Sequence, residues 1–195
     1  KGKVSEIIYH YHDAELLFGE WVPTESIQRI HKFLNREGDI IREDSYFSGE
    51  LSNRKIVEIK DVDMDLTAIY DYKGKLEKKL LILYEGNKEL HFDLSPDNDT
   101  SFFAEVKKTK LGNQTEHHIL FHDTTVIHSE VRYVYEFDER GRIISTNTLR
   151  GEEESTKYYQ YSGKDEKGNW TKLTASNKPD FSEVTSYTIV DYKYY

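Results

Sequence analysis

One short pattern occurs four times in this chain and restricts its fold more than any other feature. It consists of an aspartate or asparagine, two residues, a glycine, one residue and a large apolar residue. The first side chain can bond a backbone amide two residues on, and the glycine can close a type I turn with a bulge. The copies run from Asn35 to Ile40, Asp71 to Leu76, Asp138 to Ile143 and Asp165 to Trp170.

The repeated pattern predicts four β-hairpin corners. We expect the turn glycines to adopt the left-handed conformation and the last, apolar residue to return to the buried face. The flanking residues agree, because apolar and aromatic residues alternate with polar ones before Gly141, as in a strand. The turn glycines are Gly38, Gly74, Gly141 and Gly168, and the hairpins lie near 27–47, 66–83, 131–149 and 158–175.

These hairpins predict a mainly β fold. We expect an antiparallel β-meander of repeated hairpins that forms one large twisted sheet or an open roll, with at most one or two short helices. At 195 residues the chain fits a single β-rich domain over residues 1–195.

The segment from Pro23 to Gly38 is open to two interpretations. As a helix it would begin after Thr24, present Ile27, Ile30 and Leu34 as a stripe, and end at Gly38. As a hairpin it would share its turn with the three other copies of the pattern, and we favour the hairpin for that reason. Residues 13–21 are ambiguous in the same way.

The composition sets limits on the core and on partners. The hydrophobic share is 36% and the charged share 32%, so we expect a thin core, partly compensated by fifteen tyrosines. A net charge of −9 without a basic run argues against nucleic-acid binding. The longest aliphatic run, Leu80 to Leu83, is too short for a transmembrane segment. The absence of cysteine excludes disulfides and a cysteine nucleophile.

The start of the chain suggests export. It opens on Lys1-Gly2-Lys3, and its single methionine is Met64. We therefore expect a leader that was cleaved or omitted. A lipoprotein whose anchoring cysteine lies outside the given chain would begin in the same way.

The hairpin motifs carry a family resemblance. The segment YEFDERGRI, from Tyr135 to Ile143, resembles the YD repeat of bacterial Rhs-type proteins. The tract from Val131 to Thr174 is similar to repeats in small secreted bacterial proteins of unknown function, often lipoproteins. The uneven spacing of the turn glycines departs from the tandem pattern, so a regular spiral shell is not expected. The resemblance implies β-hairpins and an extracytoplasmic location, in the periplasm or at the cell surface.

Two groups of residues are candidates for metal binding. Asp61, Asp63 and Asp65 would lie on one face of a strand and resemble the start of a calcium loop, although Leu66 and Tyr72 occupy positions where such a loop needs glycine and glutamate. A solvated strand face would also explain them, and we favour that interpretation. His10 and His12 could share a zinc ion only with a third ligand from elsewhere, from among His117, His118, His122 and His128. We expect no cofactor, with calcium at the aspartates as the open alternative.

Aromatic residues form the remaining candidate site. Tyr158, Tyr159, Tyr161 and Trp170 could form a flat platform for a glycan or a protein partner, and Tyr192, Tyr194 and Tyr195 could form a second. Cross-strand pairs within the core would account for the same residues.

No catalytic motif is present in the sequence. There is no nucleophile elbow, phosphate loop, dinucleotide fingerprint or metalloprotease helix. We expect an extracytoplasmic, non-catalytic binding or scaffold protein whose ligand is a glycan or a protein. The alternatives are a hydrolase that acts on an extracellular polymer, which would need two facing carboxylates, and a purely structural surface protein.

Overall fold

The protein is built from antiparallel strands. The structure, a computed structural model, describes residues 3–97, 99–111, 113–121 and 127–195, with the backbone alone at 100–103, 109–111, 113–118, 120–121 and 127–128. None of the described residues is helical, and accordingly none belongs to a helix suited to crossing a membrane. The expected mainly β, antiparallel meander is confirmed.

The helical alternative for residues 23–38 is wrong. This segment contains the last residue of β2, all of β3 and the turn that ends at Gly38. Residues 13–21 likewise form strand, turn and strand. In both places the backbone hydrogen bonds go to neighbouring strands, and this pairing outweighs the helical spacing of the apolar residues.

The chain divides into two compact units. Unit 1 comprises residues 1–56, 71–74 and 158–195, and unit 2 comprises residues 57–70 and 75–157.

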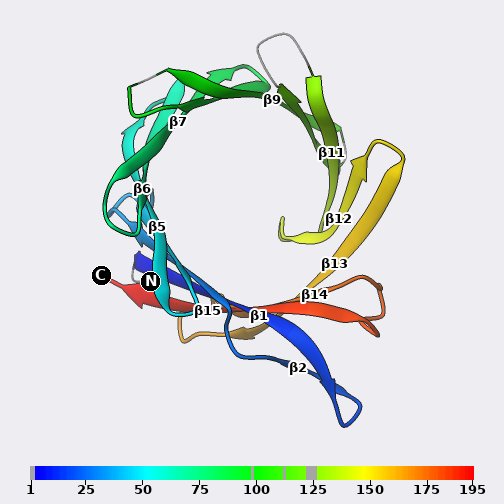
Figure 1. Ribbon diagram of the computed structural model, residues 1–195. Coiled ribbons are helices and arrows are strands. Elements are labelled where there is room, and N and C mark those ends of the chain that lie inside the picture. The colour runs from blue at the N-terminus through cyan, green and yellow to red at the C-terminus, as the bar shows by residue number, and fades with distance from the viewer. Residues whose placement is uncertain (1–2, 98, 112, 122–126) are drawn as a thin grey trace. The chain divides into compact units, whose positions relative to one another are not determined.

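Unit 1 contains the first and last strands, which are neighbours. Its strand order is β13-β14-β15-β1-β3-β4-β5, and β2 pairs with the far end of β1. Figure 1 shows β1 beside β15, with β2 leading away from them. Its strands are β1 (Val4–Leu17), β2 (Glu20–Pro23), β3 (Gln28–Leu34), β4 (Ile40–Phe47), most of β5 (Glu50–Lys60), the end of β13 (Glu153–Lys164), β14 (Trp170–Ser176) and β15 (Val184–Tyr194).

Unit 2 is a meander in which each strand pairs with the next one along the chain. The whole aliphatic run from Leu80 to Leu83 lies on β7, which pairs with β6 and β8. Its strands are β6 (Met64–Asp71), β7 (Leu76–Glu85), β8 (Lys88–Leu94), β9 (Thr100–Leu111), β10 (Asn113–Phe121), β11 (Ile127–Phe137) and β12 (Ile143–Arg150).

The four predicted corners share one turn geometry. Their glycines have positive φ, between 75° and 100°, and each glycine N–H donates to the carbonyl of the aspartate or asparagine three residues earlier. At Asp138 the carboxylate also accepts from the N–H groups of Arg140 and Arg142, both at 2.9 Å. The corner is therefore held by backbone and side chain together, which explains why the pattern recurs.

Two details differ from the expectation. Asn35 bonds the amides of Gly38 and Asp39 rather than the one two residues on. The apolar residue after the glycine is also not fully buried at any corner: Ile40 is 36% exposed, and Leu76, Ile143 and Trp170 are half-buried. A bulge follows this residue in three of the hairpins, so the returning strand is shifted at that point.

The core is thin, and most of its members are small. Only eight apolar residues are buried among those with described side chains, and seven of these are alanine or valine. Tyr187 is the one large side chain in the group, and its hydroxyl donates to the carbonyl of Trp21 at 2.7 Å. Polar contacts on the sheet faces must therefore contribute much of the stability of each unit.

Candidate functional site

One face of the unit 1 sheet carries a band of charged side chains, which we call the charged face. Residues that pair directly on antiparallel strands project to the same side of a sheet, and the registers of β15, β1, β3, β4 and β5 place three such rows next to one another. The rows are Ile189, His10, Arg29 and Tyr46; Asp191, Ile8, His31, Asp44 and Arg54; and Lys193, Glu6, Phe33, Arg42 and Ile56.

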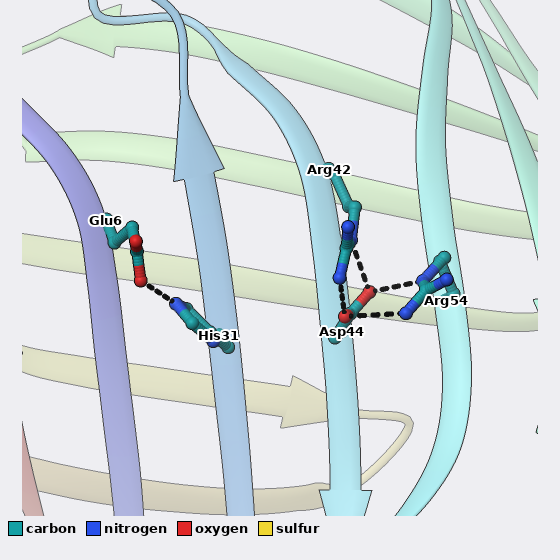
Figure 2. Close-up of polar contacts among 5 residues, drawn as sticks. All are labelled: Glu6, His31, Arg42, Asp44 and Arg54. Carbon is teal, nitrogen blue, oxygen red and sulfur yellow. Dashed lines mark hydrogen bonds and ion pairs between the residues drawn. The ribbon is translucent and has the colours of Figure 1, made fainter.

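Asp44 is the centre of the charged face. Its side chain is completely buried, yet it lies between two arginines, Arg42 on the same strand and Arg54 opposite it on β5. Arg42 Nε and Arg54 Nε donate to Asp44 Oδ1 at 2.9 and 2.8 Å, and both Nη2 atoms donate to Oδ2. Figure 2 shows the two guanidinium groups on either side of the carboxylate.

The two arginines keep Asp44 ionised. Burial alone would raise the pKa of its carboxyl group, but the hydrogen bonds from Arg42 and Arg54 outweigh burial and lower the pKa to about 2. Both carboxylate oxygens are occupied by bidentate contacts. Asp44 therefore has no free lone pair directed at a ligand and is not suited to take up a proton near neutral pH.

A second ion pair lies on the neighbouring strands. His31 Nε2 is 2.6 Å from Glu6 Oε2, as Figure 2 shows. Lys193 Nζ donates to the same oxygen at 2.8 Å. The hydrogen bond from Lys193 lowers the pKa of Glu6 most, and His31 adds a smaller effect in the same direction. The His31 ring stacks on Phe33 at 4.0 Å, which fixes its orientation.

The carboxylates share one electrostatic feature. Every aspartate and glutamate of the described residues whose pKa is clearly shifted has a pKa below the ordinary value. Hydrogen bonds from lysine, arginine, tyrosine, asparagine, serine, histidine or backbone groups produce these shifts. A general acid needs the opposite shift, toward neutral pH.

A hollow of about 150 Å³ opens beside the first row of the charged face, and we call it the Arg29 hollow. The Arg29 guanidinium stacks on the ring of Tyr46, with its central carbon 4.1 Å from the ring centroid. Its Nε atom is buried and has no hydrogen-bond partner among the described residues. The hollow is lined by His10, Ser26, Ile27, Gln28, Arg29, Tyr46 and Gly49.

Arg29 differs from the other basic residues of the charged face. Four basic side chains in the three rows, Arg29, Arg42, Arg54 and Lys193, accompany three acidic ones, Glu6, Asp44 and Asp191. Each acidic group has a partner: Asp191 lies 3.2 Å from His10 Nε2, and the other two bind Arg42, Arg54, Lys193 and His31. Among the described residues, no acidic side chain pairs with Arg29.

Unit 2 has a larger hollow, of about 350 Å³, which we call the Tyr84 hollow. Here the polar groups are matched with one another. Tyr84 donates to Asp65 at 2.7 Å, and Lys108 and His91 both contact Glu89, at 2.6 and 3.0 Å. Burial and the hydrogen bond to Asp65 raise the pKa of Tyr84. Its lining residues are Tyr84, Gly86, Asn87, Glu89 and Lys108.

The four residues of the predicted aromatic platform do not form one flat surface. Tyr158 pairs with Ser176, whereas Tyr159 and Tyr161 are at alternate positions and project to the other side of β13. Tyr161 and Trp170 are brought together, with ring centroids 6.4 Å apart and planes tilted by 60°. All four side chains are half-buried, and glycan or protein binding at them stays a prediction.

The second aromatic group is anchored by its hydroxyls. Tyr192 donates to the carbonyl of Trp170 at 3.1 Å, Tyr194 to Asp165, and Tyr195 to the carbonyl of Leu34. These three tyrosines therefore fasten β15 to neighbouring parts of unit 1.

The three candidate calcium ligands are not arranged on one strand face. Asp61 and Asp63 precede β6, and only Asp65 lies within it, where Tyr84 donates to its carboxylate. No group of three or more acidic or histidine side chains in the described part of the chain could hold a metal ion.

The histidine pair is likewise divided between different partners. His10 contacts Asp191, and His12 Nδ1 lies 2.8 Å from the carbonyl of Thr24. The side chains of the third-ligand candidates His117, His118, His122 and His128 lie outside the described residues.

Sequence reasoning missed the Arg29 hollow. The turn at Gly38 sets the β3–β4 register, so the pairing of Arg29 with Tyr46 could have been derived from the turn pattern. The pairing of Arg29 with His10 could not, because β2 lies between β1 and β3 in the sequence and β1 pairs past it.

Comparison with known proteins supports the fold alone. No family model matches the sequence, and no curated protein matches it. Among solved structures, the chain is similar to a porin-like protein from Bacteroides uniformis, with a TM-score of 0.50 over 97% of this chain and 98% of that one. The sequence identity is 11%, so the similarity concerns the β architecture.

Proposed function

We propose that this protein is a non-catalytic binding protein that acts outside the cytoplasm and takes a glycan as its ligand. The observation that carries the proposal is the contrast on the charged face of unit 1. Its carboxylates are paired with arginine, lysine or histidine side chains, while Arg29 lines a hollow without an acidic partner among the described residues. Such a surface is suited to binding an anionic group of a ligand and not to transferring a proton.

The hydrolase alternative has less support. Hydrolysis of a glycosidic bond needs one carboxyl group with a raised pKa opposite a second carboxylate. The shifted carboxyl groups of the described residues all have lowered pKa values, as at Asp44 and Glu6. A protein ligand and a purely structural surface role remain as the other candidates to be separated by experiment.

The proposed location rests on two considerations. The tract from Val131 to Thr174 is similar to repeats in small secreted bacterial proteins. A solved structure with a similar fold is described as porin-like, which is in keeping with a place at the cell envelope. Fractionation of the source cells would test this, and recovery in the cytoplasmic fraction would contradict it.

A panel of soluble neutral and acidic oligosaccharides tests the function. A ligand at 100 times its Kd stabilises the folded state by about 2.7 kcal/mol, which raises the Tm of a chain of this size by roughly 5–10 °C. We expect such a rise with one class of oligosaccharide and no release of new reducing ends. Cleavage of the oligosaccharide would favour the hydrolase, and an unchanged Tm throughout would remove glycans from consideration.

A further inference from the structure

We propose that the Arg29 hollow binds a carboxylate group and that this group belongs to a uronic acid of an acidic glycan. The inference deepens the proposed function and rests on it, because it names the class of glycan and the residue that recognises it.

Arg29 lines the hollow as a cation without an acidic partner among the described residues. The residue is half-buried, and its guanidinium stacks on Tyr46. Its Nε atom is buried without a hydrogen-bond acceptor among those residues. A buried donor without an acceptor is costly, and an acceptor supplied by a ligand would remove that cost. A planar carboxylate is the acceptor that best matches a guanidinium.

The net charge of the protein limits how an anion can be bound. The chain carries a net charge of −9, so its overall field repels anions. Binding of an acidic ligand must therefore come from a local group. On the charged face Arg29 is that group, because Arg42, Arg54 and Lys193 already contact Asp44 and Glu6.

The size of the hollow indicates that it receives one sugar unit of a longer ligand and does not enclose the whole ligand. At about 150 Å³ it is smaller than the ~300–1,000 Å³ pockets that enclose drug-sized molecules. It suits one acidic group of a longer chain that continues across the surface. Ile27, which lines the hollow, is 43% exposed and could contact the next part of such a chain.

The groups around Arg29 favour a sugar over an acidic side chain of a protein. The single proton of the Ser26 hydroxyl can go to the backbone carbonyl of Tyr11 or of Gln28, at 3.4 and 3.2 Å, and the lone pairs of its oxygen are then available to accept a hydrogen bond. The hydroxyl next to a uronic carboxylate can donate to that oxygen, whereas an aspartate or glutamate side chain carries no such hydroxyl. The His10 ring lies in the same row as Arg29.

Calorimetric titration with trigalacturonate and with its methyl ester tests the inference, because the ester keeps the sugar and removes the charge. We expect the ester to bind at least about tenfold more weakly. Arg29→Gln should weaken trigalacturonate binding by about tenfold to a hundredfold, and Arg29→Lys should weaken it less. Arg36→Gln is the matched control, since it removes the same charge outside the hollow, and it should leave the affinity unchanged.

A spectroscopic readout locates the contact without relying on variants. The side-chain ¹⁵Nε signal of Arg29, assigned by its loss in Arg29→Lys, should shift on addition of trigalacturonate. Addition of the methyl ester should leave it in place. Far-ultraviolet circular dichroism and Tm measurements confirm that each variant is folded.

The outcomes separate the inference from the proposed function. If ester and acid bind equally and Arg29→Gln has no effect, the inference is overturned while glycan binding stands. If inorganic phosphate or an acidic peptide binds through Arg29 and trigalacturonate does not, the assignment of the ligand to a glycan is overturned. If no oligosaccharide of the panel binds, the proposed function and the inference fall together.

Discussion

The Arg29 hollow and the Tyr84 hollow contain similar residue types but differ in how their charges are paired. In the Tyr84 hollow, Lys108 already contacts Glu89. A ligand carboxylate there would have to displace a bonded partner. In the Arg29 hollow the guanidinium has no acidic partner among the described residues, so a ligand would complete the pairing instead of replacing it. The Tyr84 hollow is thus larger but less suited to binding an anion, and cavity volume is a poor guide to function here.

Asp44 and its partners Arg42 and Arg54 form a completely paired group on the charged face. Its disruption should lower the free energy of unfolding more than any other change considered below. Asp44→Ala leaves Arg42 and Arg54 without their carboxylate. Loss of one partner of a fully buried pair costs about 3–5 kcal/mol. Because the two arginine side chains are 38% and 36% exposed, we expect a smaller loss of about 2–3 kcal/mol in urea unfolding.

Asp191→Ala is the control for this variant. Asp191 lies on the same face, but its side chain is 65% exposed, so its removal should change the free energy of unfolding by less than about 0.5 kcal/mol. Equal losses for the two variants would contradict the distinction between buried and exposed pairs on the charged face.

The stability contributed by Asp44 and its two arginines should be lost in acid. The pKa of Asp44 is about 2, below the ordinary 3.8, so the folded state binds fewer protons than the unfolded state in this range. Its contribution is complete above about pH 4 and is lost as the pH falls toward 2. Between pH 5 and pH 2, the free energy of unfolding should fall less for Asp44→Ala than for the wild type. If it falls equally in both proteins, the lowered pKa of Asp44 is contradicted.

Glu89→Gln converts the Tyr84 hollow into one with an unpaired cation. It removes the charge that binds Lys108 and His91, and we expect a loss of about 1 kcal/mol in the free energy of unfolding. If pairing decides which hollow accepts an anion, this variant should gain trigalacturonate binding that Lys108→Gln then abolishes. A variant that stays inert to trigalacturonate would show that pairing alone does not decide.

In the absence of ligand, Arg29→Met should change the free energy of unfolding least. The substitution loses the stacking on Tyr46 but also removes a buried donor without a partner, and these effects oppose each other. We expect a change of less than about 0.5 kcal/mol in the free energy of unfolding. A loss above 1 kcal/mol would indicate that Arg29 is needed for folding and would weaken its assignment to binding.

The hairpin corners could be predicted from the sequence because their cause is local. Asp138, two residues and Gly141 contain every group that closes the turn. The registers next to those turns follow from the same residues, which is why the β3–β4 hairpin was predicted correctly. The helical spacing of Ile27, Ile30 and Leu34 was misleading, since strand pairing overrode it.

The candidate site could not be predicted because its cause is not local. Glu6, His31 and Lys193 meet only because β1 pairs with β3 on one side and β15 on the other. The predicted platform failed to form one surface for a simpler reason. Tyr158 and Tyr159 are adjacent on a strand, and adjacent residues face opposite ways.

The pairing of β1 with β15 has a consequence for folding in the cell. His10 and Asp191, which contact each other, are 181 positions apart. During synthesis at ~5–20 residues per second, one edge of β1 waits roughly 10–40 s for its partner strand. An unpaired edge of this kind is a template for other chains, and distant pairings also form slowly. The nascent chain is therefore most prone to aggregation in the interval before its last strand is made, and a chaperone that covers strand edges should raise its yield.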